Sequence, residues 1–361
     1  MEIEKNIEIL KACRYCPMCR HVCTSGNISF HESDYPRGRG LILDKIFEGR
    51  IEYTPDLSDT IYNCCLCGLC WSNCEGGYKP HKLILTARED IVNQNRIPGA
   101  VLEIVEKIES GRNPYAGSSE VYKGKEKNAD ILYYMGDYVK FNSHSIAESV
   151  MKILKKAGAS YSIFKNEQTD GKILSLLGFT AKARDMAKKL YQRIMDLNPG
   201  TILVSDPLSY DSFKNDFPAY GIKLKTRVLH ISQYLADLIK KKKLKVKQLN
   251  EKVTLADSEF LGRFNQVFDA PRKVLKAVAG NNIIEMKNNK EMALATGEAA
   301  IIFNGKISMV GNIIGSRICK EAADAGARTI ITLSGVARRN MKDCREMDVF
   351  EISEFICQNI L

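Results

Sequence analysis

Eight of the twelve cysteines form two runs with the same spacing, C-x2-C-x2-C-x3-C. The first run is Cys13, Cys16, Cys19 and Cys23, and the second is Cys64, Cys67, Cys70 and Cys74. Three thiolates at intervals of three residues can wrap one face of a cuboidal [4Fe–4S] cluster. A structural zinc site would need only two C-x2-C pairs. The spacing therefore favours iron–sulfur clusters over zinc.

The fourth cysteine of each run begins a departing helix and reaches the other cluster more easily than its own. We therefore expect crossed ligation by two sets of four thiolates. One set is Cys13, Cys16, Cys19 and Cys74, and the other is Cys64, Cys67, Cys70 and Cys23. Cys65 is out of register, which indicates a small buried residue beside a cluster rather than a ligand.

The other three cysteines, Cys319, Cys344 and Cys357, are scattered singly near the C-terminus. This distribution is unlike a disulfide scaffold, and clustered cysteines with metal roles are typical of reducing compartments. We expect Cys319 to lie in the core of a helical segment. A third cluster built from these three residues is not expected.

The sequence around the cysteines has the 3.6-residue periodicity of helices, over residues 3–13 and 81–94. Residues 1–100 thus predict a small α-helical domain built around its cofactors, and 101–128 a linker. From Ala129 onward short apolar strands alternate with amphipathic helices. The pattern predicts two tandem α/β units, 129–238 and 249–361, joined by a basic helix end or loop at 239–248. The fold class expected is α+β.

Composition excludes several classes of protein. The formal net charge of +10 falls to roughly +6 once eight thiolates and two cluster cores are counted, so the basic balance is ordinary. No run is apolar enough to span a membrane, and the first residues do not resemble a signal peptide. Interleaved aromatics typical of nucleic-acid binding are missing. A cytoplasmic protein with no nucleic-acid partner and no membrane span is expected.

Together with the cysteine runs, two short segments resemble the C-type module of heterodisulfide reductase: YPRGRG at 35–40 and NPY at 113–115. The same module occurs in the iron–sulfur subunits of anaerobic glycerol-3-phosphate dehydrogenase and glycolate oxidase. The tandem α/β part resembles the CCG repeats of the B-type and D-type subunits of heterodisulfide reductase, most specifically in Leu261-Gly262-Arg263 and in 269–272. The resemblance implies a D-like protein, with a ferredoxin-like two-[4Fe–4S] domain followed by a degenerate CCG domain.

The chain departs from that family where the repeats should carry cluster cysteines. The matching positions read Gly136-Asp137, 169–171 and 206–209 in the first repeat, and 256–259, 295–297 and 334–337 in the second. None of these positions holds a thiol. One interpretation is a docking scaffold without ligands. The other is a hard-cation site formed by carboxylates at or beside the former ligand positions, namely Asp137, Asp170, Asp206, Asp257 and Glu259.

The sequence therefore predicts an electron-transfer subunit without catalytic residues of its own. Two [4Fe–4S] clusters would relay single electrons between a flavoprotein and a second redox partner in an anaerobic oxidoreductase complex. The flavoprotein would be an FAD-containing oxidoreductase or an electron-transfer flavoprotein, and other iron–sulfur subunits are further candidate partners. The alternative is a catalytic heterodisulfide or disulfide reductase component with an atypical C-terminal site.

Overall fold

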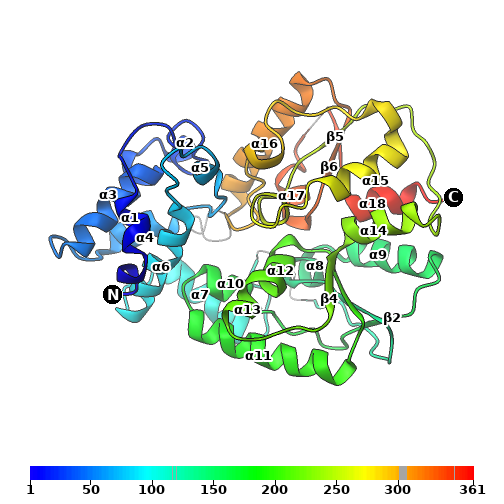
Figure 1. Ribbon diagram of the computed structural model, residues 1–361, viewed down its shortest axis with the longest axis horizontal. Coiled ribbons are helices and arrows are strands. Elements are labelled where there is room, and N and C mark those ends of the chain that lie inside the picture. The colour runs from blue at the N-terminus through cyan, green and yellow to red at the C-terminus, as the bar shows by residue number, and fades with distance from the viewer. Residues whose placement is uncertain (116, 119, 301–306, 345) are drawn as a thin grey trace.

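The computed structural model describes residues 1–115, 117–118, 120–300, 307–344 and 346–361. Positions 116 and 119 of the predicted linker, and 301–306 and 345 of the second predicted repeat, lie outside the described residues. The molecule combines helices with small parallel sheets, so the α+β class is confirmed at that level. Figure 1 shows the N-terminal part (blue to cyan) beside two α/β units, the first green and the second yellow to red.

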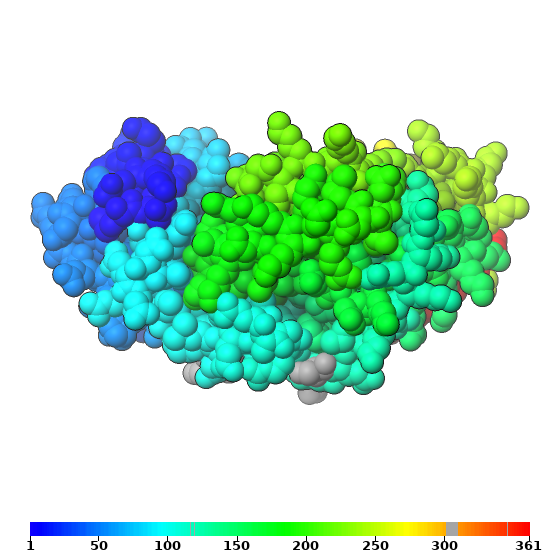
Figure 2. Space-filling model, turned by 90° about the horizontal axis from the view of Figure 1, so that it is seen from below, coloured from blue at the N-terminus to red at the C-terminus, as the bar shows by residue number. Residues whose placement is uncertain are grey.

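The N-terminal part is helical, as its periodicity predicts, and most of its helices are short. Its helices are η1 Glu2–Asn6, α1 Ile7–Lys11, α2 Gly26–Ser29, η2 Glu32–Asp34, α3 Pro36–Phe47, α4 Pro55–Tyr62, α5 Leu69–Ser72, α6 Pro80–Asn93 and α7 Gly99–Glu109. Helices α3, α4 and α6 each begin with proline, whose fixed φ suits a first helical turn. Helix α7 occupies the start of the 101–128 segment and buries Val101, Ile104 and Val105. In Figure 2 the cyan residues near position 100 lie between the blue N-terminal part and the green unit.

The first α/β unit contains the strands and helices that alternate after Ala129. They are β1 Ile131–Tyr134, α8 Asp137–Asn142, α9 His144–Lys156, β2 Tyr161–Ile163, α10 Lys172–Leu176, α11 Thr180–Leu197, β3 Thr201–Val204, α12 Pro207–Asp211, η3 Ser212–Asp216, α13 Phe217–Ala219, β4 Arg227–His230 and α14 Ile231–Lys240. Helix α14 ends inside the basic segment 239–248, as predicted. Strand β1 is buried along its whole length, which is typical of a parallel strand covered on both faces.

The second α/β unit repeats this alternation with fewer strands. Its elements are β5 Val253–Leu255, η4 Glu259–Arg263, α15 Asp269–Ala279, η5 Gly280–Asn282, η6 Lys290–Met292, α16 Ile307–Asp324, β6 Thr329–Thr332, α17 Gly335–Asn340, β7 Asp348–Glu351 and α18 Ile352–Gln358. Over the described ranges the strands form two parallel sheets, ordered β2-β1-β3-β4 and β5-β6-β7. Both sheets contribute to one continuous hydrophobic core.

The helical N-terminal part packs against both α/β units. Leu208 of α12, Phe260 of η4 and Val336 of α17 belong to its hydrophobic core. The hydroxyl of Tyr62 donates to the carbonyl of Leu177 at 2.8 Å. In the described part of the chain, no helix combines the length and apolar character needed to cross a bilayer.

Candidate iron–sulfur sites

The two cysteine runs share the same local backbone turn. Tyr15 and Leu66, which occupy equivalent positions, have positive φ angles of 54° and 50°. This left-handed conformation lets the amide N–H of Tyr15 donate to Cys13 Sγ at 3.4 Å. Leu66 N–H donates to Cys64 Sγ at the same distance. N–H groups aimed at sulfur stabilise a thiolate, so each turn is suited to hold a negatively charged ligand.

One cavity collects the thiols of one predicted ligand set. Its lining includes Cys23, Cys64, Cys67 and Cys70. Thr24 Oγ1, one residue after Cys23, lies 3.8 Å from Cys67 Sγ, and Gly26 N–H donates to Cys23 Sγ at 3.3 Å. The fourth cysteine of the first run thus faces the second run.

The other predicted set gathers around Cys13. Burial raises the pKa of the Cys13 thiol, and the nearby Cys74 and Cys16 raise it further. Cys19 is also buried, which raises its pKa to about 11, while the backbone N–H of Arg37 partly offsets this effect. Cys16 is exposed to solvent. Cys74 therefore lies close enough to Cys13 to raise its pKa.

Among the described residues, no three or more Cys, His, Asp or Glu side chains converge on a position for a single metal ion. A cuboidal cluster needs a different arrangement, because each of its four irons binds one thiolate and the four sulfur atoms do not surround a single ion. The thiols of the two runs, some of which accept backbone N–H groups, are chemically suitable ligands for such clusters. Cys65 lines the same cavity as Cys64 but also packs in a core cluster with the second α/β unit.

Three buried arginines surround the second run. Arg39, from the YPRGRG segment, pairs with Asp34 at 3.0 Å and lies near Cys23 and Cys64. Arg88 donates to the carbonyl of Cys64 at 2.8 Å, and Arg263 donates to the carbonyl of Cys67 at 2.6 Å. Fixed positive charge beside thiolates offsets the cost of burying an anionic cluster.

Arg263 joins the cysteine loop to the second α/β unit. Its guanidinium also donates to the carbonyls of Glu291 at 2.9 Å and Ala293 at 2.5 Å, and the side chain is only 2% exposed. Gly68, between Cys67 and Cys70, has φ +71°, and a Cβ there would lie 2.8 Å from the ring of Phe264. Glycine is therefore required where the loop meets η4.

His81 lines the cavity together with the second-run cysteines and packs against two further rings. The ring of His81 lies 5.3 Å from that of Trp71 and 5.2 Å from that of Phe264. Burial lowers the pKa of His81 to about 4, so the ring is neutral at pH 7. Its Nδ1 atom is buried without a hydrogen-bond partner in the described structure. A neutral ring therefore lies on one side of the cavity.

In both repeats, the positions that carry cluster cysteines in the family are occupied here by polar residues. Their side chains accept hydrogen bonds from nearby backbone N–H groups. Asp206 accepts from Leu208 N–H at 3.0 Å, and Ser334 accepts from Ala337 N–H at 3.0 Å. Both residues are helix N-caps following a strand. Glu259 accepts three backbone N–H groups, those of residues 296–298.

The remaining carboxylates at these positions are also engaged. Asp257 binds the guanidinium of Arg272 through two contacts of 2.8 Å. Asp137 accepts from Lys140 at 2.9 Å, and Asp170 accepts from Lys172 N–H at 2.7 Å. In the part of the chain that is described, these side chains do not form a group able to hold a cation. The structure gives no support to the hard-cation interpretation.

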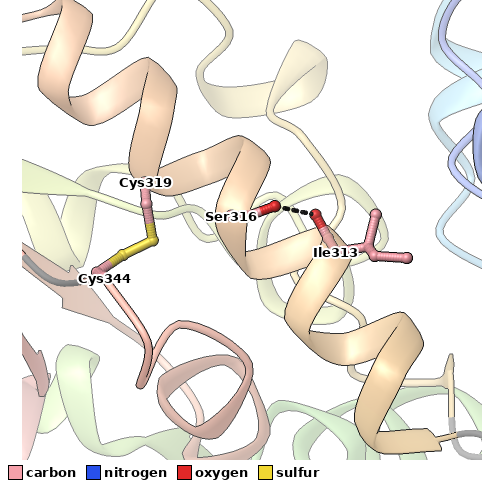
Figure 3. The surroundings of a disulfide bond; sticks show 4 residues. All are labelled: Ile313, Ser316, Cys319 and Cys344. Carbon is pink, nitrogen blue, oxygen red and sulfur yellow. Dashed lines mark hydrogen bonds between the residues drawn. A yellow bond between two sulfur atoms is a disulfide. The ribbon is translucent and has the colours of Figure 1, made fainter.

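The C-terminal cysteines contain a feature that the sequence did not reveal. Cys319 of α16 and Cys344 form a disulfide across a separation of 25 residues (Figure 3). Both are partly exposed and line a shallow cavity between α16 and the segment after α17. The expectation that Cys319 is simply a core residue was therefore incomplete, whereas Cys357 is a free thiol.

Sequence reasoning also missed the residues that hold the cysteine loops in place. Arg39, Arg88 and Arg263 act through buried contacts to residues distant in sequence, up to 196 positions for Arg263 and Cys67. The available signal was Arg263 in the family-like Leu-Gly-Arg segment and Arg39 in YPRGRG. Neither motif indicates its partner carbonyls.

Similar proteins of known name include iron–sulfur proteins, in agreement with a site built from cysteines. The D-type component of the dihydromethanophenazine:CoB–CoM heterodisulfide reductase of Methanosarcina mazei is 27% identical over 305 residues, covering 81% of this chain and 74% of that protein. The probable iron–sulfur-binding oxidoreductase FadF of Bacillus subtilis is 24% identical and covers 86% of this chain. The chain is a relative of the D-type heterodisulfide reductase proteins. The resemblance inferred from the sequence is confirmed, and its relatives include a protein named as an iron–sulfur-binding oxidoreductase.

The EtfAB:quinone oxidoreductase of Syntrophomonas wolfei is 30% identical over 261 residues, covering 66% of this chain and 36% of that protein. The chain spans 49% of the length of FadF, so it matches only part of some relatives. No family model matches the sequence. A solved structure of an Asp/Glu racemase homologue from Yersinia pestis matches with a TM-score of 0.32 and 16% identity over 63% of this chain.

Proposed function

We propose that this protein is an electron-transfer subunit that binds two [4Fe–4S] clusters. One cluster is bound by Cys13, Cys16, Cys19 and Cys74, and the other by Cys64, Cys67, Cys70 and Cys23. Residues 1–100 form the ferredoxin-like domain, 101–128 the linker, and 129–238 and 249–361 two CCG-like repeats without cluster ligands. We also propose a cytoplasmic location, where the cysteines of the two runs stay reduced and able to bind iron; the Cys319–Cys344 disulfide is uncommon in such a compartment.

The proposal depends mainly on one observation. Cys23 lines the same cavity as Cys64, Cys67 and Cys70, although it lies more than forty positions away from them in the sequence. Crossed ligation requires this neighbourhood, whereas two independent zinc sites would not. The matching N–H···S turns at Tyr15 and Leu66 support a shared ligand role for both runs.

When bound, the clusters supply one-electron carriers. The chain's own residues hold and shield the thiolates. Arg39 and Arg263 offset their negative charge, and the neutral ring of His81 lines the cavity beside the second-run cysteines. Among the described residues, no set of three or more Cys, His, Asp or Glu side chains is placed to hold a single metal ion that could act on a substrate.

The partner we propose is a flavoprotein, either an FAD-containing oxidoreductase or an electron-transfer flavoprotein. A relative is named EtfAB:quinone oxidoreductase, and others are subunits of heterodisulfide reductase. A two-electron flavin needs one-electron carriers to reach a distant acceptor. The chain would provide them, with other iron–sulfur subunits as further partners in the complex.

Anaerobic reconstitution followed by iron and sulfide analysis tests the proposal. About eight irons and eight sulfides per chain are expected. The loaded chain should be bleached by dithionite, but it should reduce no disulfide and oxidise no substrate without an added flavoprotein. A plateau near four irons would mean that one run is not a cluster site. Disulfide reduction by the flavin-free chain would instead favour the catalytic alternative.

A further inference from the structure

A disulfide and ten free thiols occur together in this chain. Cys319 and Cys344 are joined, whereas the other ten cysteines are free. The proposed iron–sulfur clusters need a reducing compartment, in which free thiols persist. A disulfide in such a compartment is usually transient and serves catalysis or redox sensing. The Cys319–Cys344 pair is therefore suited to reversible chemistry rather than to a permanent structural role.

Both cysteines of the pair are accessible from solvent. Each is half-buried, and the two line a surface cavity together with Ser316 and Met347. The neighbouring Lys320 and Asp343, which border the same cavity, are exposed. Exchange begins when a thiolate attacks one sulfur of a disulfide, so exposed disulfides are reduced more readily than buried ones. An incoming thiolate can therefore reach this pair without unfolding of the chain.

The part of the second α/β unit that the disulfide encloses has packing contacts of its own. Between the two cysteines lie β6, which pairs with β5 and β7, and helix α17. Ile330 of β6 and Ala337 of α17 are buried in a hydrophobic cluster, and Cys319 and Cys344 pack only at its margin. The Cα atoms of the pair lie 5.8 Å apart, within the usual range for a disulfide. The dithiol and the disulfide can therefore share one backbone fold.

Helix α16 connects the disulfide to the second-run site. Ile318, directly before Cys319, packs in the same buried cluster as Cys65, which lines the second-run cavity. Arg317 donates to the carbonyl of Asn27 at 2.6 Å, four residues after a predicted ligand of that site. The disulfide holds this helix to the segment after α17. Its reduction would therefore remove a restraint from a helix that packs beside the second-run site.

We propose that Cys319–Cys344 is a thiol–disulfide exchange site for a small dithiol protein of the thioredoxin type. Such exchange is separate from electron relay by the clusters and depends only on the proposed reducing compartment. A thiolate of the partner attacks one sulfur, the S–S bond breaks, and the released sulfur takes up a proton. The partner's second thiol then attacks the mixed disulfide and releases the other cysteine. The partner loses two electrons and two protons, and Cys319 and Cys344 gain them as two thiols.

Equilibration with thioredoxin tests the exchange directly. The reconstituted full chain is incubated anaerobically with mixtures of reduced and oxidised thioredoxin, quenched with acid and alkylated. Mass spectrometry of the peptides that contain Cys319 and Cys344 then gives the oxidised fraction of the pair. Half oxidation is expected at a ratio of reduced to oxidised thioredoxin within about a hundredfold of one. A pair that stays mostly oxidised, or mostly reduced, across that whole range would overturn the proposal.

Cys357 provides a matched control, because it is a half-buried free thiol on α18. Cys357→Ser should leave the titration unchanged. A thioredoxin without its resolving cysteine should form a covalent adduct with the oxidised wild type and with Cys357→Ser, and about tenfold less with Cys319→Ser/Cys344→Ser. Equal adduct in the double variant would overturn the assignment to this pair. None of these measurements uses iron: a chain that binds no clusters would refute the relay, and the same titration would still decide the exchange site.

Discussion

Asp206 occupies a position that carries a cluster cysteine in the family, and its raised pKa predicts a measurable pH dependence of stability. It is 4% exposed and begins α12, where its side chain accepts from Leu208 N–H. Burial, with smaller contributions from nearby Asp170 and Asp137, raises its pKa from 3.8 to about 8. At pH 7 the folded protein therefore keeps a proton on Asp206, whereas the unfolded chain releases it.

The sign of the pH dependence follows from this difference. Between pH 4 and pH 8 the folded state binds more protons at Asp206 than the unfolded state, so stability falls as the pH rises. The slope is about 1.4 kcal/mol per pH unit, which gives about 3 kcal/mol between pH 5 and pH 7. Asp206→Asn can keep the helix cap but cannot titrate. The variant should therefore gain about 3 kcal/mol relative to wild type over the same interval.

Native-state hydrogen exchange of the β3–α12 peptide, read by mass spectrometry at pH 5 and pH 7, measures the effect in both proteins. Infrared difference spectra at pH 7 should also show one fewer protonated carboxyl in Asp206→Asn. Ser334→Asn changes the equivalent cap in the second unit and should give the same offset at both pH values. A wild type and an Asp206→Asn variant with parallel pH dependence would refute the reasoning.

Three further outcomes are expected. Cys74→Ser should lower the reconstituted iron content to about four per chain and damage the first-run cluster, whereas Cys65→Ser should keep about eight; equal losses would contradict crossed ligation. Arg263→Gln should lower the free energy of unfolding, measured by chemical denaturation, by about 3 kcal/mol, because buried carbonyls lose a charged donor. It should also make the second-run cluster labile to oxygen. An unchanged denaturation midpoint would show that Arg263 does not stabilise the cysteine loop. The double variant Cys319→Ser/Cys344→Ser should retain all its iron, and iron loss there would implicate these residues as ligands.

The sequence predicted strands β1, β3 and β6 and the edge strand β5, and it missed the edge strands β2, β4 and β7. β1, β3 and β6 are apolar and largely buried along their length, which makes them readable as strands. β2, β4 and β7 lie at sheet edges and contain exposed or half-buried polar positions. Their pairing depends on a neighbouring strand that sequence periodicity does not reveal.

The part of the candidate site that depends on the spacing of the two cysteine runs could be predicted from the sequence. The contacts between segments distant in the sequence could not. The spacing of the runs led to the pairing of Cys23 with the second run, a neighbourhood that the cavity lining contains. The contact between Arg263 and Cys67 depends on how η4 packs on the cysteine loop, which no local pattern specifies. The same holds for Cys319 and Cys344, whose approach is set by α16 lying beside the segment after α17.

The α/β units and the helical N-terminal part use different acceptors for the backbone N–H groups of their buried loops. In the α/β units the loops at family ligand positions close on themselves, through Asp206 and Ser334 as helix caps and Asp257 paired with Arg272. Those loops need no metal to satisfy their N–H groups and charges. In the helical part, Cys13 and Cys64 instead accept backbone N–H bonds as sulfur acceptors, which become stronger when the thiol is ionised by a metal. We therefore expect iron binding to stabilise the N-terminal part, whereas the α/β units share a hydrophobic core that contains no cluster ligand.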